Sequence, residues 1–407
     1  MLIQKEYKEE RLMGLKAEDV FRPGAFPEYT YISRKSAVSN LSYEFRLTQA
    51  IKVAGFLTSL VGPSKMGKTI LCEKVIGFDH IVEISGADFD EDTDFWKLLA
   101  IKAGLSYEGQ FSSEKLIADT NDKYSKKEIF SLTKDKIIEY YKNQNLVLVI
   151  DDFHYAPEGK RMQIAQQLKD AIRRGFKAIV VSLPHRADEA IRQNPDLSGR
   201  LSLINMKAWE VNELKEIAKI GFKKLNLKIE DVVATQIAVE SLSSPQLMQY
   251  ICLNICTILE MDGDNCDTVK QEMLETAYQY TTANFEYGDV VSLMQKGPNT
   301  RGKGRNKFRA ENGQEYDIYE LIVKSIAENP PIMKLEFEDV KERIYHLILN
   351  DVKKPTPQAI KESLVKLKEL LNSREDIFKV IDWKEGTLYI LDPLFLFYLR
   401  WGGNENV

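Results

Sequence analysis

The sequence predicts an α/β domain built on a parallel β-sheet, followed by a helical domain and a small C-terminal domain of helices and a β-hairpin. Three observations predict this order. Between residues 53 and 206, short apolar runs alternate with amphipathic helical stretches, which is typical of a parallel sheet covered by helices. A glycine-rich stretch, "GPSKMGKT" (62–69), joins a predicted strand to a predicted helix. From about residue 210 the strand signals stop, and helical periodicity takes over.

Composition narrows the class of protein. The 407 residues are 44% hydrophobic, enough for several globular cores, and the net charge of -5 argues against a chain that is basic throughout. The start, "MLIQKEYKEERLMG", is charged from its fifth residue, and the longest apolar runs are far too short to span a bilayer. The four cysteines form no CxxC pair, and the four histidines are scattered. We therefore expect a cytoplasmic protein without a membrane partner, a disulfide framework or a structural zinc site.

The elements follow in order. An N-terminal segment (1–50) leads into the predicted α/β domain (51–208). Apolar runs predict five strands in this domain, at residues 56–62, 80–85, 146–151, 178–183 and 201–206. Between the third and fourth predicted strands, "KRMQIAQQLKDAIRRG" places Ile164, Leu168 and Ile172 on one helix face. The alternation of strand and helix predicts a doubly covered sheet.

A helical domain is predicted over residues 209–285, where Ser244 caps a helix that has Pro245 at its first position. A basic, flexible linker (286–315) and a third domain (316–407) follow. The third domain shows helices near 316–328 and 336–350, a helix opened by Thr356, and an alternating stretch that turns at Gly386. Three helices and a two-stranded hairpin predict a winged helix.

The stretch "GPSKMGKT" matches the phosphate-binding pattern G-x-x-x-x-G-K-[ST] without a gap and lies between a strand and a helix, as that pattern requires. Its N–H groups and the following helix would hold phosphate oxygens, the lysine would bridge the β- and γ-phosphates, and the threonine hydroxyl would ligate Mg²⁺. We therefore expect ATP and Mg²⁺ as ligands. The expected nucleotide contacts are Gly62, Pro63, Ser64, Lys65, Met66, Gly67, Lys68, Thr69 and Ile70.

Two carboxylates end the strand "LVLVID" and are the candidates for the chemistry. Asp151 is the expected second partner of the metal, through a water, and Asp152 stands where a general base would polarise the attacking water. An aspartate is one methylene, about 1.5 Å, shorter than a glutamate, so slow hydrolysis is expected. The alternative for Asp152 is a structural cap or salt bridge at the strand end.

Further candidates follow the later strands. If the fourth strand lies between the strand before the phosphate loop and the Asp151 strand, Ser182 and Arg186 would sense the γ-phosphate. Arg200 is a candidate arginine finger toward a neighbouring subunit, with a surface ion pair as its alternative. The stretch 296–309 carries six basic residues and no acid, which indicates either a solvated linker or a contact with the phosphates of double-stranded DNA.

The combination of "GPSKMGKT", "LVLVIDDF", "DLSGRLSLINMKAWEVNEL", a helical stretch with "SLSSPQLMQYIC" and a winged helix resembles the AAA+ ATPases. More narrowly, it resembles the STAND ATPases, the branch that includes NACHT and NB-ARC proteins. The resemblance covers roughly residues 20–400. It implies that Pro245 contacts the nucleotide from a lid, that Arg186 is a sensor and that Tyr31 contacts the base. The glycine usual before the lid's x-Pro is Ser243 here.

Three functions remain open from the sequence. The first is a slowly hydrolysing, nucleotide-gated oligomerisation switch acting on itself or a separate effector chain; the resemblance places it in antiphage defence or a mobile-element system. The second is a DNA-directed AAA+ ATPase of the replication-initiator or transposition-regulator type, which would hold double-stranded DNA through 296–309 and the winged helix. The third is an ATP-dependent scaffold that does not hydrolyse. Turnover separates the third from the others, and salt-sensitive DNA retention separates the second from the first.

Overall fold

The computed structural model describes residues 15–36, 39–105, 133–183, 199–261, 267–299, 304–374, 376–377 and 379–402. It divides into two compact units. The first, called here the helical unit, comprises Met1–Ile32, Ser64–Met66 and Ala208–Val407. The second, called the α/β unit, comprises Ser33–Pro63 and Gly67–Lys207.

The α/β unit is built on a five-stranded sheet in the order β2-β3-β4-β1-β5, in which all neighbours are parallel. All five predicted strands are confirmed within two residues, and β4 lies between β1 and β3, as the expectation for the γ-phosphate sensor required. The strands are β1 (Leu57–Val61), β2 (Ile81–Ser85), β3 (Val147–Asp151), β4 (Lys177–Ser182) and β5 (Leu201–Asn205).

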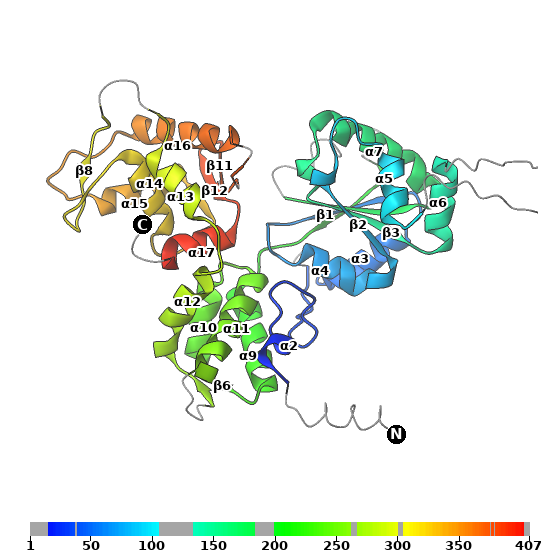
Figure 1. Cartoon of the computed structure of the whole chain (residues 1–407), viewed down its shortest axis with the longest axis horizontal. Helices are drawn as coiled ribbons and strands as arrows, with labels where there is room; N and C mark the ends of the chain where they lie inside the picture. The colour runs from blue at the N-terminus through cyan, green and yellow to red at the C-terminus, as the bar shows by residue number, and fades with distance from the viewer. Residues whose placement is uncertain are drawn as a thin grey trace, which may run out of the picture. The chain divides into compact units, whose positions relative to one another are not determined.

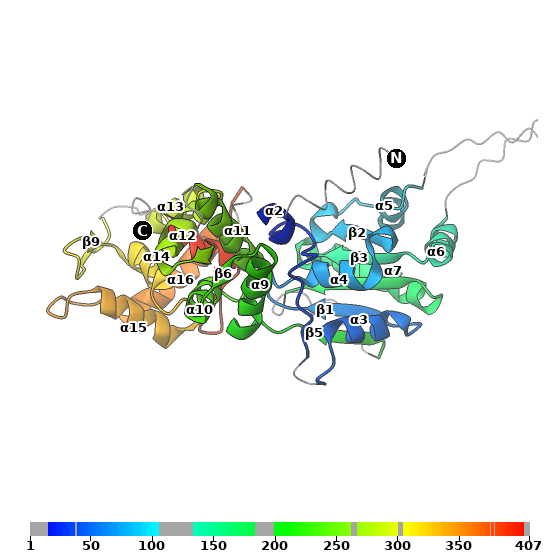
Figure 2. The same ribbon diagram turned by 90° about the horizontal axis from the view of Figure 1, so that it is seen from below.

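Helices cover both faces of this sheet (Figures 1 and 2). One face packs against α3 (Tyr43–Lys52) and α4 (Lys68–Ile76), and the other against α5 (Phe95–Lys102), α6 (Lys134–Asn143) and α7 (Glu158–Arg173). Successive side chains of a strand point to opposite faces, and β3 follows this rule: Val147 and Val149 join one core, Leu148 and Ile150 the other. Short 3₁₀ turns complete the unit: η1 (Phe78–His80), η2 (Gly86–Asp88) and η3 (Phe153–Tyr155).

The helical unit begins with α2 (Ala17–Val20) and continues with α9 (Val211–Lys224), α10 (Asp231–Glu240), α11 (Pro245–Met261) and α12 (Leu274–Thr282). Small elements between them are β6 (Lys228–Ile229), β7 (Thr268–Val269) and η4 (Gln271–Met273). The predicted cap of α11 is confirmed, because the Leu247 N–H donates to Ser244 Oγ at 3.2 Å. Phe21 packs against α9 where Gly221 leaves room, since a Cβ there would lie 2.2 Å from the Phe21 ring.

The rest of this unit contains α13 (Gly288–Lys296), α14 (Ile318–Ala327), α15 (Phe337–Leu347), α16 (Pro357–Asn372) and α17 (Pro393–Trp401). Its strands are β8 (Phe308–Arg309), β9 (Glu315–Tyr316), β10 (Lys334–Glu336), β11 (Ile381–Lys384) and β12 (Thr387–Ile390). The three predicted helices and the hairpin turning at Gly386 are present. In addition, β10 pairs with β12 to make a three-stranded antiparallel sheet. The sequence did not predict this pairing, because β10 is too short to show a strand pattern.

Two parts of the predicted flexible linker are ordered by side-chain packing. Gly288–Lys296 form α13, with Val290, Val291 and Met294 buried. Arg305, expected in a mobile basic loop, is held in place: its guanidinium donates to the Asp317 carboxylate at 2.8 Å and lies 4.5 Å from the centroid of the Tyr319 ring. It also donates to the main-chain carbonyls of Lys296 and Pro298. Arg305 therefore uses its charge inside the protein.

One buried ion pair joins α10, α14 and α17. The Glu240 carboxylate accepts two bonds from the Arg400 guanidinium, at 2.8 and 3.1 Å, and one from the Trp401 indole N–H at 2.8 Å. Arg400 also donates to the Ala327 carbonyl at 2.8 Å. The Arg400 side chain is 7% exposed and that of Glu240 14%. Such a pair is specific in geometry because the planar guanidinium must meet both carboxylate oxygens.

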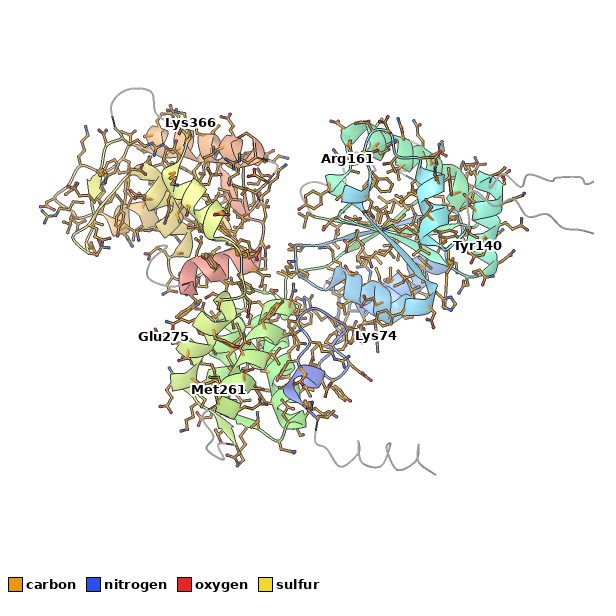
Figure 3. The ribbon with its side chains drawn as sticks, in the orientation of Figure 1. Lys74, Tyr140, Arg161, Met261, Glu275 and Lys366 are labelled. Carbon is orange, nitrogen blue, oxygen red and sulfur yellow. The ribbon has the colours of Figure 1, made fainter. Side chains whose placement is uncertain are left out.

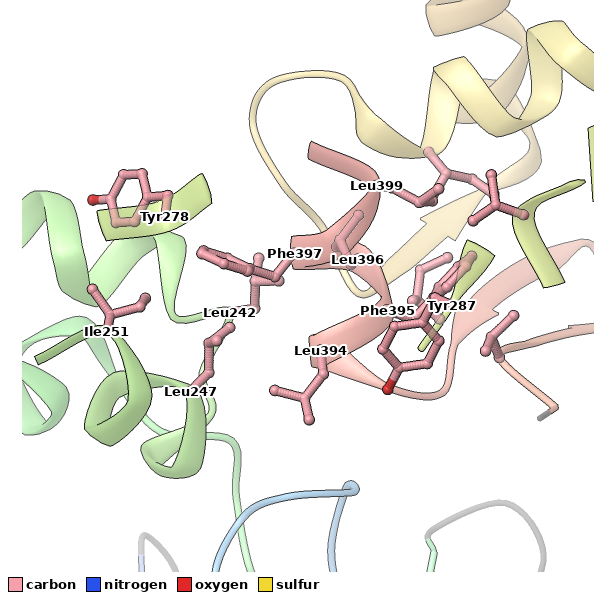
Figure 4. Close-up of a cluster of buried hydrophobic side chains, with 14 of the residues drawn as sticks. Leu242, Leu247, Ile251, Tyr278, Tyr287, Leu394, Phe395, Leu396, Phe397 and Leu399 are labelled. Carbon is pink, nitrogen blue, oxygen red and sulfur yellow. The ribbon is translucent and has the colours of Figure 1, made fainter. Parts of the chain in front are cut away.

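Aromatic packing surrounds this ion pair. Figure 4 shows Phe397 of α17 directed toward Tyr278 of α12, and Phe395 beside Tyr287. The ring centroids of Tyr278 and Phe397 are 5.7 Å apart in an edge-on arrangement. The Tyr287 hydroxyl donates to the Asp392 carboxylate at 2.8 Å, and Asp392 in turn caps α17. The start of α17 is thus fixed by both apolar contact and hydrogen bonding.

No helix in the described stretches combines the length and the apolar character needed to cross a membrane.

Replacing Arg400 with alanine should destabilise the helical unit by about 3–5 kcal/mol, because it leaves the Glu240 carboxylate buried without its partner. Chemical denaturation followed by tryptophan fluorescence measures this loss. The control is Arg374→Ala, which removes an exposed pair with Asp376 and should cost less than about 1 kcal/mol. Equal losses of unfolding free energy in the two variants would show that the buried pair stabilises the protein no more than the exposed pair does.

Candidate functional site

The phosphate-binding loop leaves β1 and enters α4 through two residues with special backbone needs. Gly67, the residue before α4, has φ 83° and ψ 30°, a left-handed conformation that glycine adopts at little cost. Gly62 has main chain on both sides: its N–H donates to the Ser182 carbonyl at 3.2 Å, and a Cβ would lie 3.1 Å from Met206 Cβ. The fold therefore favours both glycines of the motif, Gly62 for space and Gly67 for its backbone conformation.

Lys68 begins α4 with its ammonium group directed back at the loop. Its Nζ donates to the carbonyl oxygens of Gly62 at 3.0 Å and Pro63 at 2.7 Å, and the residue is only 8% exposed. A buried ammonium group needs such acceptors, because desolvation without partners is costly. The loop thus places a positive charge where phosphate oxygens would take over from carbonyl oxygens.

Thr69 and Asp151 come together from α4 and β3. The Thr69 hydroxyl donates to Asp151 Oδ2 at 2.7 Å, across 82 positions of sequence. A hydroxyl and a carboxylate side by side offer the oxygen ligands that Mg²⁺ prefers, and such sites are completed by nucleotide phosphates and water. The side chains of Thr69 and Asp151, which were predicted to hold the metal, therefore offer suitable ligands for Mg²⁺. A bound Mg²⁺ would neutralise phosphate charge here.

The residue after the strand, Asp152, lies in a left-handed turn with φ 47° and ψ 42°. Its N–H donates to Asp151 Oδ1 at 2.8 Å, and its carbonyl accepts from the Tyr155 N–H at 2.9 Å, which starts η3. The left-handed region is sparsely populated by residues other than glycine, with aspartate and asparagine among the exceptions. Asp151 therefore ends the extended strand, whereas Asp152 already belongs to the turn that leads into η3.

Carboxylates shape the electrostatics beneath α4. Burial raises the pKa of the Cys72 thiol, and the Asp151 carboxylate raises that pKa further. Burial, followed by Asp151, also raises the pKa of Glu83 on β2, while Lys102 opposes the shift. The Asp151 carboxylate therefore disfavours a further negative charge on Cys72 and Glu83, and a bound cation would reduce this repulsion.

The predicted sensors have different outcomes. Ser182 ends β4 opposite Val61, is 1% exposed, and its hydroxyl has no hydrogen-bond partner among the described residues. A buried hydroxyl without a partner is uncommon and is available to a ligand at this strand end. Arg186 lies outside the described residues. The sensor role of both residues stays a prediction.

Arg200 is not brought to the other candidates within its own chain. Its carbonyl accepts from the Leu57 N–H at 2.9 Å, and Leu57 is the first residue of β1. The phosphate loop follows Val61 at the opposite end of that strand, roughly 13 Å along it at the usual rise per residue. Arg200 also makes no ion pair within the described part of the chain, so the finger in a neighbouring subunit remains a prediction.

The tip of the loop, Ser64–Met66, belongs with the helical unit. The Trp209 indole N–H donates to the Met66 carbonyl at 3.1 Å, and the Ser244 hydroxyl donates to the Lys65 carbonyl at 3.5 Å. Trp209 is a contact that the sequence did not single out, and its position just before α9 carries no motif that would have shown it. Pro245, the predicted nucleotide contact, follows Ser244 at the first position of α11.

Other predicted contacts also belong to the helical unit. The Tyr31 ring stacks on Phe26 at a centroid distance of 5.7 Å and an interplanar angle of 14°. Tyr31 as a contact of the base stays a prediction. Ile70, in contrast, lies within the first turn of α4 in the α/β unit.

The turn before Pro245 is conformationally unusual. Leu242 and Ser243 both have left-handed backbones, with φ 52° and 59°. Each such residue costs about 1–2 kcal/mol when it carries a Cβ. The position of Ser243 is therefore one at which glycine is physically favoured, in agreement with the glycine that the resemblance implies there.

The α/β unit has the fold of a P-loop NTPase domain. A parallel sheet, a glycine-rich loop between β1 and α4, and a Thr69–Asp151 contact at the sheet's carboxyl edge define it. Residues 30–211, which span α3 to β5, match the family model described as "Bacterial TniB protein". This match covers less than half of the chain. No curated protein matches the sequence.

Solved structures of low identity are also similar. A Walker-type ATPase of Pyrococcus abyssi is 14% identical, with 88% of this chain and 94% of that chain covered at a TM-score of 0.48. Cdc6p from Pyrobaculum aerophilum is 13% identical, with 94% and 97% covered at 0.43. The ORC2 protein of Aeropyrum pernix, in ADPNP-ADP complexes, is 14% identical, with 91% and 94% covered at 0.46.

Replacing Asp151 with asparagine should reduce the gain in ATP affinity that Mg²⁺ provides by about tenfold or more, because the amide keeps the shape and loses the charge. Binding of a fluorescent ATP analogue, with Mg²⁺ and with EDTA, measures this gain. Asp92→Asn, an exposed aspartate in the same unit, serves as the control. An unchanged Mg²⁺ effect in Asp151→Asn would contradict the metal assignment.

Replacing Ser243 with glycine should raise the stability of the helical unit by about 1 kcal/mol, since glycine removes the steric cost of the left-handed backbone. Leu242→Gly is the contrasting variant: it has the same backbone sign but loses a side chain that is 5% exposed, so it should destabilise. The denaturation midpoints of both variants, compared with that of the wild type, test this prediction. A loss of stability in Ser243→Gly would mean that the serine side chain outweighs its backbone strain.

Proposed function

We propose that the protein is an AAA+-type ATPase that binds ATP with Mg²⁺, hydrolyses it slowly and works as a nucleotide-gated switch. Lys68, Thr69 and Asp151 would hold the phosphates and the metal, and Asp152 would act as the general base. Ser182 would sense the γ-phosphate. The proposal extends to ADP as the resetting ligand and to self-association or a separate effector chain as the output.

The observation that carries the switch is the bonding of the loop tip. Ser244 and Trp209 both donate to main-chain carbonyls of the phosphate loop, at Lys65 and Met66. A nucleotide that reorders the loop's N–H groups also moves these carbonyls, because the peptide unit is rigid. The helical unit is therefore in a position to respond to the nucleotide through two hydrogen bonds.

A continuous path supports a response beyond the loop. Ser244 follows the left-handed turn at Leu242 and Ser243, and Glu240 ends α10 two residues before Leu242. Glu240 is bonded to Arg400 and Trp401 at the end of α17. A turn held in sparsely populated backbone conformations stores strain, and in the proposed switch a small shift at Ser244 would release it. We infer that the C-terminal helix is the element that changes with the nucleotide.

Slow turnover is supported by the geometry of the base. Asp152 has the shorter acidic side chain, and its backbone conformation is set by the turn into η3. A base must come within hydrogen-bond reach of the attacking water, so a side chain about 1.5 Å too short would leave part of the population unproductive. We interpret Asp152 as a working but inefficient base.

A DNA-directed AAA+ ATPase is the second candidate. It is favoured by the arrangement of α14, β10, α15, α16, β11 and β12, which we interpret as a winged helix. The charges of α16 favour it less. Lys368 is paired with Asp382 at 2.9 Å, and Lys361 lies over the Phe337 ring, while Lys366 projects from the helix in Figure 3. A switch in which this region contacts protein therefore remains our first choice.

Steady-state ATP hydrolysis tests the proposal. The wild type should turn over slowly, Lys68→Ala should be inactive, and Asp152→Asn should lose about 10²-fold, the usual contribution of a general base. Asp152→Glu should hydrolyse faster than the wild type because its carboxylate reaches further. Wild-type turnover that does not depend on Lys68 would sink the ATPase assignment, and full activity in Asp152→Asn would leave Asp152 a structural cap.

The same assay with double-stranded DNA separates the two candidates. A rate unaffected by DNA supports the switch. A rate that DNA raises several-fold, with an effect that disappears as salt is raised, supports the DNA-directed ATPase, because phosphate contacts weaken steeply with salt. Binding of ATP without turnover in any condition would leave a scaffold.

A further inference from the structure

We propose that Gly86, the residue after β2, is a positioning residue that holds the turn of Asp152 through direct contact of the two main chains. The inference rests on the proposed function of Asp152 as the base. Gly86 lies in the neighbouring strand's exit loop and was no part of the predicted site. Its role is set by the absence of a side chain.

The contact is closer than any side chain allows. A Cβ built on Gly86 would lie 2.2 Å from the Asp152 carbonyl oxygen, 2.9 Å from its carbonyl carbon and 3.0 Å from Phe153 Cα. All three atoms belong to the main chain, so no rotamer change would relieve the clash. Gly86 is also buried. Its backbone is not among the left-handed ones, so the requirement for glycine is one of space alone.

The β2 side of this contact is firmly held. The Ser85 N–H donates to Asp88 Oδ2 at 3.1 Å, and the Ala87 N–H donates to Ser85 Oγ at 3.2 Å. Asp88 also pairs with Lys102 of α5 at 3.2 Å. These bonds fix η2, in which Gly86 is the first residue, against the rest of the unit.

The Asp152 side of the contact is the one that would move. Asp152 already occupies the sparsely populated left-handed region, and its carbonyl, the atom nearest to Gly86, also accepts the Tyr155 N–H that starts η3. A methyl group on Gly86 would therefore push this carbonyl, rotate the Asp152 peptide and misplace the carboxylate. Asp151 precedes the turn within the β3 ladder, where its pairing with Ser85 keeps it in place. Metal and phosphate binding should thus survive a change that impairs the base.

The test compares Gly86→Ala with Gly159→Ala. Gly159 lies in the first turn of α7 in the same unit, and the nearest atom to its added Cβ is the tip of Glu91 at 3.8 Å, so the control adds the same methyl group without a clash. Gly86→Ala should lower kcat by about tenfold to a hundredfold, the usual effect of a small misplacement of a catalytic group. The Kd of a non-hydrolysable ATP analogue should stay within about threefold, and Gly159→Ala should match the wild type in both.

Hydrogen exchange provides a readout that does not need turnover. In Gly86→Ala the Tyr155 amide, bonded to the Asp152 carbonyl at 2.9 Å, should exchange faster. The Leu71 amide, bonded to the Gly67 carbonyl at 3.0 Å, should be unchanged. If Gly86→Ala does not fold, Asp88→Asn decides instead, because Asp88 is exposed and its loss loosens the same turn. It should accelerate exchange at Tyr155 and lower kcat about two- to fivefold.

The outcomes are distinct. Unchanged Tyr155 exchange in the folded variant overturns the role of Gly86, whatever the wild-type turnover is. Faster exchange with unchanged kcat overturns it as well, since the turn would then move without consequence for the base. A wild type without Lys68-dependent turnover removes the proposed function, while the exchange experiment still decides whether Gly86 holds the turn.

Discussion

The site depends on one constraint: parallel strands deliver their carboxyl ends to the same edge of the sheet, and β4 lies between β1 and β3. That order leaves room for α4 to begin where β3 ends, so that the Thr69 hydroxyl meets the Asp151 carboxylate at 2.7 Å. A different strand order would change the distance between the ends of β1 and β3 by at least one strand spacing, about 4.8 Å. The loop, the metal ligands and the buried Ser182 hydroxyl all follow from this arrangement.

The loop's main chain serves two purposes that its side chains do not. Its carbonyls accept bonds from Lys68, Ser244 and Trp209, and the N–H groups that follow Gly62 would meet the phosphates. The residues that hold these carbonyls lie far apart in the sequence. In the proposed switch, Ser244 and Trp209 would respond to the nucleotide through these carbonyls.

More basic side chains form ion pairs within this protein than its composition suggests. Arg305 looked available for a phosphate backbone, yet it joins Asp317, Tyr319 and two carbonyls. Lys368 is similarly taken by Asp382. A count of lysines and arginines overstates the positive surface when acids lie close in space but far in sequence. The same holds for Arg400, whose partner Glu240 is 160 residues away.

The five strands, the phosphate loop and the Asp pair could be predicted from the sequence, because they depend on local periodicity and on residue types at fixed spacing. The cap at Ser244 and the turn at Gly386, which are local as well, could also be predicted. The folded chain alone shows the pairing of β10 with β12, the indole bond from Trp209 to the Met66 carbonyl and the close contact of Gly86 with Asp152. Each of these contacts joins residues distant in sequence and has main-chain atoms on at least one side, so it leaves no pattern of residue types at fixed spacing.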